Sequence, residues 1–437
     1  MANCTNNLQK NIEEAVNGQT IEIQHGTYEL SKNLTWSDKT LNILGVGQVV
    51  LKKTFTEEAP MIQGINAGQS KISNLHLVSD DFSQYNHGPF NGAVRNNENW
   101  SGIYFENSPE VLVENIRVDN RITGISLTGS AHSTVRNLTG TGFGDRIILS
   151  GNAPNWHQLL RICSSDKTTV RGLRSDNYGS AILVTSYSSK LAELKPQIGV
   201  NINNLRSTRS QDHAVYITKG SNRTVVNDAQ MSGGPSSLIR IDGDVCSISN
   251  AIGQDGNVVV SVRANDVWLE SIHGYDMRSD VVRFSEQLSN RKIIQNARAV
   301  HLTGTRVGGA VIKGTTNFLS AEDIQALEGG VAVSLSDGRQ NSLDNVRSFN
   351  TSVHSIDLVR ESSPTIRNLN TLGSFTQLKG ERRYARLVEV SNGLFVDWNA
   401  EGSVLENVTC SHNLFSNINS TGTNSFLGAH TSIISVK

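Results

Sequence analysis

The sequence is poor in cysteine, in net charge and in long apolar runs. Its four cysteines are far apart and form no metal-spaced pair, so we expect reduced or buried thiols: Cys4, Cys163, Cys246 and Cys410. The net charge of −1 gives no overall field that would attract nucleic acid or a membrane surface. No apolar run approaches the roughly 18 residues that a membrane-spanning helix needs. These absences predict neither a disulfide framework nor a metal site, and neither a nucleic-acid nor a membrane partner.

The N-terminus lacks a signal peptide as well. The first residues, MANCTNNLQ, contain neither a basic region nor an apolar core. We therefore expect either a secreted protein whose chain begins after cleavage or a virion-associated protein made without a leader. The sequence also predicts no cofactor, and no motif in it indicates a Ca²⁺ site.

What the sequence does contain is a repeat. Between residues 212 and 359 a short apolar strand recurs about every 24 residues: HAVYI at His213, LIRID at Leu238, VVVSV at Val258, VVRFS at Val281, AVIKG at Ala310, VAVSL at Val331 and SIDLV at Ser355. A repeat of this length indicates a solenoid. Because each unit is rich in β-branched residues and is followed by Gly, Asn, Asp and Ser, we predict strands and turns rather than helices.

The alternation inside each repeat sorts the side chains onto two faces. In LIRID, Ile239 and Ile241 point inward and Arg240 outward, and in VVRFS, Phe284 points inward and Arg283 outward. One face of the stacked strands then forms a continuous aliphatic core, while the other carries exposed columns of polar groups. The modest apolar content of 37% and the 38 glycines suit such a thin core with many turns.

These stacked coils resemble the right-handed parallel β-helix of the pectin-lyase-like superfamily. Residues 6–17, NNLQKNIEEAVN, come before TIEIQHGTYEL, and this opening is similar to the helix that caps the first coil in that superfamily. We expect this helix to stop at Gly18 and to bury Leu8, Ile12, Ala15 and Val16. The fold prediction is an all-β, single-domain right-handed parallel β-helix over residues 1–437, with loop insertions near 80–100, 151–158, 186–197 and 373–385.

The outward positions of successive strands predict one polar column, which is where we place the functional site. Aligned by repeat, the column contains Tyr104, Ser126, Ile148, Leu183, Tyr216, Arg240, Ser261 and Arg283. A neighbouring column contributes Arg146, Asp242 and Arg263, and the strands are preceded by Asp145, Asp176, Asn177, Tyr178, Asp212 and His213. Neighbouring coils lie about 4.8 Å apart, so side chains on adjacent coils fall within one or two sugar lengths. Trp100 and Trp156 belong to the first two insertions, where they either stack on sugar rings or pack on their own coils.

Two chemistries fit this band of Tyr, Arg, Asp and His. In β-elimination from a uronate polymer, His213 or Tyr216 serves as base or acid while Arg240 stabilises the developing negative charge. The substrate is then bound by Arg263, Arg283, Arg146, Tyr178, Asp176, Trp100 and Trp156. In hydrolysis, two carboxylates flank the glycosidic bond, and the candidate pairs are Asp212 with Asp242 and Asp176 with Asp212. The outward arginines favour elimination on an acidic polysaccharide, because a neutral glycan has little use for stacked guanidinium groups.

Each of these residues also has a structural explanation. An outward arginine on a solenoid is commonly a solvated charge, and an aspartate before a strand commonly caps a turn, as His213 can also do. Three functions therefore stay open: a polysaccharide lyase or hydrolase, a phage tailspike-like glycan-binding homotrimer that also cleaves its glycan, and a non-catalytic β-helix adhesin. We prefer the lyase, with a polysaccharide as its partner.

Overall fold

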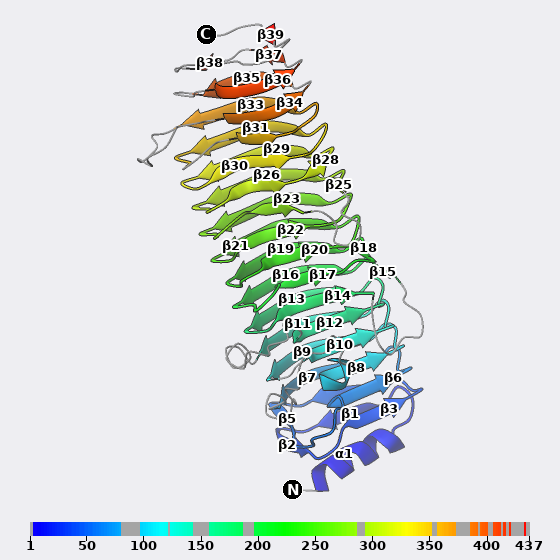
Figure 1. The fold of residues 1–437 in the computed structure, drawn as a ribbon. Coiled ribbons are helices and arrows are strands. Elements are labelled where there is room, and N and C mark those ends of the chain that lie inside the picture. Colours follow the sequence, from blue (N-terminus) through cyan, green and yellow to red (C-terminus); the bar gives the residue numbers. More distant parts are fainter. Residues whose placement is uncertain are drawn as a thin grey trace. The chain divides into compact units, whose positions relative to one another are not determined.

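The structure is a computed structural model that describes residues 3–79, 97–120, 123–142, 157–186, 196–285, 293–351, 356–372, 385–391, 394–400, 405–411, 414–416, 419–420 and 432–433. The chain divides into two compact units, residues 1–234 and 235–437, and each is described by itself. Within each unit, parallel strands stack in chain order into two sheets, here called sheet 1 and sheet 2 (Figure 1). The predicted extent of one domain over residues 1–437 stays a prediction.

Unit 1 begins with helix α1 (Asn3–Glu14). Its sheet 1 contains β1 (Thr20–Ile23), β2 (Gly26–Leu30), β4 (Asn42–Gly45), β5 (Val49–Lys53), β7 (Lys71–Val78), β9 (Leu112–Asp119), β11 (Thr134–Thr141), β13 (Thr169–Asp176), β16 (Asn201–Thr208) and β19 (Val225–Ser232). Its sheet 2 contains β3 (Leu34–Ser37), β6 (Ile62–Ile65), β8 (Ser101–Glu106), β10 (Thr123–Thr128), β12 (Gln158–Cys163), β14 (Ser180–Thr185) and β17 (Val215–Ile217). A 3-10 helix η1 (Asn97–Trp100) precedes β8, and β15 (Gln197–Ile198) pairs with β18 (Ser221–Asn222).

Unit 2 has the same two sheets. Sheet 1 contains β21 (Ser247–Gln254), β23 (Trp268–Tyr275), β26 (Arg298–Thr305), β29 (Ser320–Leu327), β31 (Ser342–Phe349), β33 (Thr365–Leu372), β35 (Leu394–Ala400), β37 (Leu414–Ser416), β38 (Asn419–Ser420) and β39 (Ser432–Ile433). Sheet 2 contains β20 (Ser237–Ile241), β22 (Val258–Val262), β24 (Val282–Phe284), β27 (Ala310–Gly314), β30 (Val331–Ser336), β32 (Ile356–Val359), β34 (Ala385–Ser391) and β36 (Leu405–Ser411). The short strands β25 (Ile294–Gln295) and β28 (Thr316–Asn317) pair with each other.

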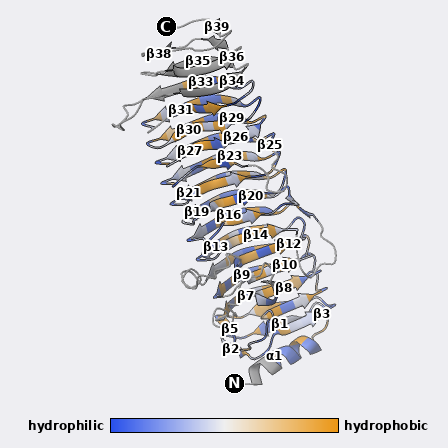
Figure 2. Cartoon of the chain, viewed as in Figure 1, coloured by the Kyte–Doolittle hydropathy of each residue, from blue (hydrophilic) through white to orange (hydrophobic). Residues whose placement is uncertain are grey.

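Each coil passes through one strand of sheet 2 and one strand of sheet 1, and its inward side chains stack on those of the next coil. In unit 1 the register of sheet 2 aligns fully buried aliphatic side chains: Ile103, Ile125, Leu160, Ile182 and Val215. In unit 2 it aligns Ile239, Val260, Val282, Ile312, Val333 and Ile356 in the same way. Hydrophobic residues accordingly recur along the strands of successive coils (Figure 2). The predicted parallel β-helix with an aliphatic core is confirmed.

A column of left-handed residues bends the strands of sheet 1. Asn74, Asn115 and Asn137 have φ angles of 60°, 55° and 53°, a conformation that asparagine adopts more readily than most residues. Their side chains form a ladder, in which Asn115 Nδ2 donates to Asn74 Oδ1 and Asn137 Nδ2 donates to Asn115 Oδ1, both at 2.9 Å. These asparagines therefore lie at bends within the coils and not in loops.

The N-terminal helix lies three residues earlier than predicted at each end. Leu8, Ile12 and Ala15 are buried as expected. The prediction that Val16 is buried is wrong, because Val16 is 70% exposed. The helix already ends at Glu14, and Val16 lies in the turn that leads to Gly18. Position 16 therefore falls outside the helical stripe on which the prediction depended.

Contacts from the first coils fix this helix in place. Gln9 pairs its side-chain amide with the backbone of β3: its Nε2 donates to Thr35 O and its Oε1 accepts from Thr35 N, both at 3.0 Å. Lys39 Nζ donates to the carbonyls of Ile12 and Ala15 at 2.7 and 2.9 Å, and also to that of Glu13. The helix thus covers the first edge strand of sheet 2, and the lysine satisfies carbonyls that a helix end leaves without intrahelical partners.

Candidate functional site

The predicted outward column exists in sheet 2 of unit 1, with one correction. The register pairs Tyr104 with Ser126, Ser126 with Arg161, Arg161 with Leu183, and Leu183 with Tyr216. Arg161 therefore occupies the position predicted for Ile148, which lies outside the described residues together with Asp145. The prediction failed because β12 comes after the second insertion, whereas the repeat was placed before it.

One end of this column is deeply buried. Tyr104 and Ser126 have no exposed surface, Arg161 is 5% exposed, and Tyr104 Oη donates to Glu106 Oε2 at 2.8 Å. The Ser126 hydroxyl is buried without a hydrogen-bond partner within the described residues. A buried hydroxyl without a partner costs free energy. Leu183 and Tyr216 are half-buried, so the column opens toward β17.

The open end of the column holds the proposed proton-transfer residues. The rings of His213 and Tyr216 lie 5.2 Å apart, and His213 Nε2 lies 3.4 Å from Asp212 Oδ1. The side chain of His213 is only 7% exposed and that of Asp212 is 23% exposed. The backbone N–H of Asp212 donates to Gly179 O on the preceding coil, which holds this segment against β14. A carboxylate beside an imidazole orients the ring.

The two candidates before the preceding strand have other surroundings. Tyr178 is fully buried, with its ring 5.7 Å from that of His157, which is also buried. Asp176 accepts hydrogen bonds from Arg209 Nε and Thr208 Oγ1 at 2.8 and 2.7 Å. The Arg209 guanidinium holds the pKa of Asp176 below its usual value, so this carboxylate is charged and already bound.

The first insertion ends in a buried aromatic residue. Trp100 is 5% exposed, and Lys53 Nζ lies 4.6 Å from the centre of a Trp100 ring and 4.7 Å from that of Phe55. Trp100 thus packs against the lysine on the preceding coil, at the end of β5. Trp156 and Arg146 lie outside the described residues, and their proposed part in substrate binding stays a prediction.

Unit 2 carries the predicted arginines on the outward face of its sheet 2. The register aligns Arg240, Ser261, Arg283, Lys313, Ser334 and Asp357. Arg263 follows β22, and its N–H donates to Ile241 O, which places it beside Asp242.

Two of these arginines are bound to carboxylates. Arg240 forms a two-pronged hydrogen bond to Asp242, with Nη2–Oδ2 and Nε–Oδ1 distances of 2.8 and 3.1 Å. Arg283 Nε donates to Asp280 Oδ2 at 2.6 Å, and Asp280 is fully buried and also accepts from Ala310 N. The predicted catalytic set is thus divided: His213, Tyr216 and Asp212 belong to unit 1, and Arg240 and Asp242 to unit 2.

The residues that sequence reasoning missed are Arg161, Glu106 and Asp280. Arg161 could have been found, since QLLRIC alternates like the other strands of sheet 2. Nothing in the sequence signals that Glu106 accepts from Tyr104 or that Asp280 is buried beneath Arg283, because both contacts depend on the fold. Within the described residues, no three His, Cys, Asp or Glu side chains gather as metal ligands would. The helices of the described part are also too short or too polar to cross a membrane.

Comparisons with known proteins identify similar structures. The N-terminal fragment of bacteriophage phi29 gene product 12 matches with a TM-score of 0.59 at 12% identity, over 96% of this chain and 85% of that chain. The catalytic domain of a GH87 alpha-1,3-glucanase in complex with nigerose matches with 0.48 at 13% identity, over 89% and 66%. A PL6 alginate lyase in complex with a trisaccharide matches with 0.48 at 10% identity, over 85% and 83%.

This chain spans slightly less than two thirds of the glucanase catalytic-domain structure, 66% of its length. No family model matches the sequence, and no curated protein matches it. At these identities the similarity is one of fold. It confirms the predicted architecture: the chain has a parallel β-helix fold, which it shares with the phi29 fragment.

Proposed function

We propose that this protein depolymerises an acidic, uronate-containing polysaccharide by β-elimination on the outward face of sheet 2. The observation that carries the proposal is the arrangement in unit 1. His213 and Tyr216 lie with their rings 5.2 Å apart, and Arg161 stands in the same outward column two strands away. This arrangement supplies two proton-transfer groups and a cation, which are the groups that elimination α to a carboxylate requires.

Each residue has a definite part in the proposed reaction. One of His213 and Tyr216 removes the proton α to the uronate carboxylate, and the other donates a proton to the departing glycosidic oxygen. The electron pair of the broken C–H bond forms the new double bond as the C–O bond breaks. Arg161 stabilises the charge that develops on the carboxylate, and its strand lies roughly 10 Å from that of Tyr216 along the stack, about two sugar lengths. Asp212 orients His213.

The aspartates support elimination over hydrolysis. A hydrolase needs two carboxylates positioned on either side of the glycosidic bond. Asp176 is bound by Arg209, and Asp242 by Arg240, so both already neutralise arginines. In unit 2, Arg283 lies on the outward face of sheet 2, and we propose it with Arg263 as substrate-binding residues of that unit.

The test is a pair of substitutions, His213→Ala and Tyr216→Phe, assayed separately on polygalacturonate and alginate. The residue that acts as base should cost about 10²–10⁴-fold in rate, while Asp212→Asn costs less. Tyr275→Phe, at an exposed tyrosine of sheet 1 in unit 2, is the matched control and should keep full activity. The ultraviolet absorbance of an unsaturated uronate product reports elimination, and new reducing ends without that absorbance report hydrolysis.

Other results of these measurements would favour a hydrolase, an adhesin or a tailspike-like protein over the lyase. Loss of activity in Asp212→Asn and Asp242→Asn, with His213→Ala and Tyr216→Phe both active, would replace the lyase by a two-carboxylate hydrolase. Binding of a polymer without any cleavage would assign an adhesin. Light scattering would show whether the protein is the homotrimer that a tailspike-like role requires.

A further inference from the structure

The outward face of sheet 1 in unit 1 carries a cluster of arginines that the proposed reaction does not use. Four neighbouring strands, β9, β11, β13 and β16, present the cluster, here called the arginine face: Arg117, Arg136, Arg171, Arg174 and Arg206. The register places Arg136 opposite Arg171 and Arg174 opposite Arg206. Like charges directly opposite each other in neighbouring strands destabilise a sheet, so the fold by itself does not favour this arrangement.

The outer members of the face are compensated, and the central two are not. Arg117 binds Asp119 at 2.9 Å, Arg136 binds Glu114, and Arg206 binds Asp228 at 3.3 Å. Arg171 and Arg174 are both exposed, and within the described residues neither has a hydrogen-bond or ion-pair partner. Two guanidinium groups on one strand therefore stand uncompensated between arginines that already have carboxylates.

A glycine in the left-handed region follows the first of these two arginines. Gly172 separates them with a φ angle of +70°, in the column where the adjacent strands have Asn137 and Asn204. A Cβ at Gly172 would lie 3.1 Å from Asn137 Oδ1, closer than ordinary van der Waals contact. The asparagine column therefore lacks one side chain between Arg171 and Arg174, where the amide of Asn137 covers the glycine.

The equivalent face of unit 2 has the opposite charge balance. On strands β23, β26, β29, β31 and β33, the acidic side chains outnumber the arginines: Glu270, Glu322, Asp323 and Asp344 against Arg298, Arg347 and Arg367. Position 171 of unit 1 corresponds to position 367 of unit 2, the third residue of its strand. Sheet 1 forms with an excess of arginines in unit 1 and with an excess of acidic residues in unit 2. The positive charge of the arginine face is therefore not required for folding of the coils.

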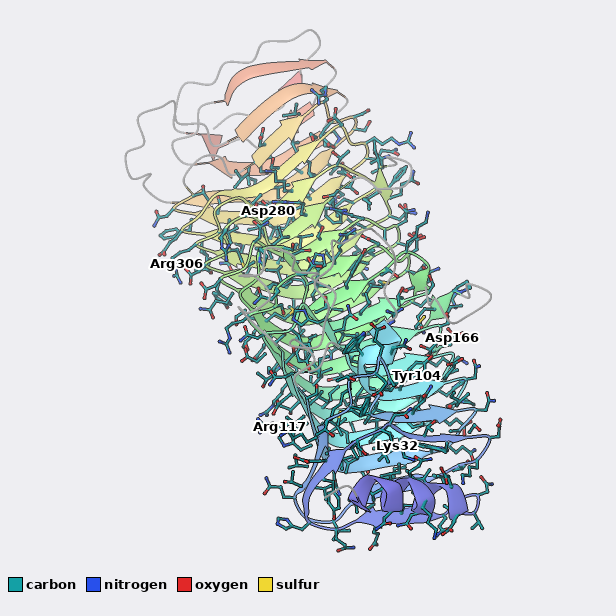
Figure 3. All side chains as sticks on the ribbon, turned by 60° about the horizontal axis from the view of Figure 1, so that its bottom comes forward. Lys32, Tyr104, Arg117, Asp166, Asp280 and Arg306 are labelled. Atoms are coloured by element: carbon teal, nitrogen blue, oxygen red, sulfur yellow. The ribbon has the colours of Figure 1, made fainter. Side chains whose placement is uncertain are left out.

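We propose that the arginine face binds a linear acidic glycan, at a surface separate from the outward face of sheet 2. Arg117 on β9 and Tyr104 on β8 show where sheet 1 and sheet 2 lie (Figure 3). Guanidinium groups on successive coils repeat along the stack at multiples of about 4.8 Å, so a polymer with a carboxylate on each sugar meets several of them. The ligand class, an acidic glycan, rests on the proposed function; the surface itself rests on its charge.

A nucleic acid fits this face less well. Carboxylates of Glu114, Asp119 and Asp176 interrupt the arginines and would repel a dense row of phosphates. Single strands are usually held by aromatic side chains on which bases stack, and the four strands of the face contain no aromatic residue. Uronate polymers carry less charge per unit length and need no stacking surface.

The experiment compares the double variant Arg171→Glu/Arg174→Glu with Arg367→Glu, which is equivalent to Arg171→Glu alone at an exposed position of unit 2. Binding of polygalacturonate, alginate, neutral dextran and duplex DNA is measured by calorimetry at low and moderate salt, and cleavage of the two polyuronates is measured in parallel. The double variant should lose roughly tenfold or more in affinity for a polyuronate at low salt, with a weaker salt dependence. Arg367→Glu and wild type should bind alike, dextran should not bind, and unchanged unfolding curves exclude a folding defect.

The outcomes separate this inference from the proposed function. Equal polyuronate affinity in the double variant and wild type overturns the arginine face as a binding surface, even if both variants cleave the polymer. Binding lost in the double variant, with no cleavage by wild type, supports the face and overturns the proposed lyase. Duplex DNA bound through Arg171 and Arg174 as tightly as a polyuronate overturns the glycan as its ligand.

Discussion

At the scale of single residues, the alternation of the sequence predicted which way a side chain points better than it predicted how deeply that side chain is buried. The outward positions of Tyr104, Tyr216, Arg240 and Arg283 follow from the period of two, and the register confirms them. The period of two does not show that Tyr104 is fully buried. Nor does it show that Arg240 forms a hydrogen bond to Asp242. Those properties depend on which side chains from other coils and turns meet at a point, which no local pattern contains.

Glu361 shows the same limit. It is 1% exposed in a turn of unit 2, and its carboxylate accepts from Gly338 N at 2.9 Å and from Asn341 Nδ2 at 2.8 Å. Asn341 Nδ2 also donates to Thr316 O at 2.9 Å, so the network joins three successive coils. Burial outweighs these hydrogen bonds and, with the neighbouring charge of Asp337, raises the pKa of Glu361 to about 7.

This pKa predicts a loss of stability with rising pH. The unfolded carboxyl titrates near 4.5, so between about pH 4.5 and 7 the folded state binds the extra proton. The free energy of unfolding should therefore fall across that window, by up to about 3 kcal/mol for this group. Glu361→Gln should flatten that part of the pH profile, while Glu270→Gln, at an exposed position, should leave it unchanged. Urea unfolding midpoints at several pH values measure both, and an unaltered profile in Glu361→Gln would refute the assignment.

At the scale of elements, strands were predicted well and the helix less well. The strands of sheet 2 repeat their pattern, so each supports the position of the next. Helix α1 occurs once, and its end was placed by Gly18 alone. Its actual end at Glu14 coincides with the carbonyls that Lys39 binds, a contact over some 25 residues of sequence that periodicity does not reveal.

The contact between Lys39 and α1 gives a prediction for the cap. Lys39→Met keeps the length of the side chain but leaves the carbonyls of Ile12, Glu13 and Ala15 without the ammonium. Hydrogen bonds to charged groups contribute about 1.5–3 kcal/mol, so the variant should lose about 2 kcal/mol in the free energy of unfolding. Lys32→Met, at an exposed lysine in the turn between β2 and β3, is the control and should change little (Figure 3). If both variants unfold alike, the lysine does not stabilise the helix end.

At the scale of the whole molecule, repetition made the fold predictable and the site difficult to predict. A coil that recurs needs only its period and its inward residues to be recognised, and both are local. A site on such a fold depends on which coils receive which side chains and on the insertions between them. Because the second insertion shifts the strand along the sequence, Arg161 and not the predicted Ile148 lies in the outward column. Chemistry on a solenoid is therefore placed by register, which sequence alone gives only where the repeat is uninterrupted.

The core prediction can be tested at Ile241. Its side chain is fully buried at the end of β20, and the register places it on Val262, which in turn stacks on Phe284. Ile241→Asp puts a carboxylate without a partner into this narrow aliphatic stack, which costs several kcal/mol or forces the group to stay protonated. Because each coil is stabilised by its neighbours, the damage should spread to β22 and β24 and should unfold unit 2. Thermal unfolding followed by circular dichroism measures the loss, and Ser334→Asp, at an outward position of the same sheet, should unfold nearly as wild type does. An Ile241→Asp variant that melts with wild type would mean that LIRID does not face the core, and the outward assignment of Arg240 would fail with it.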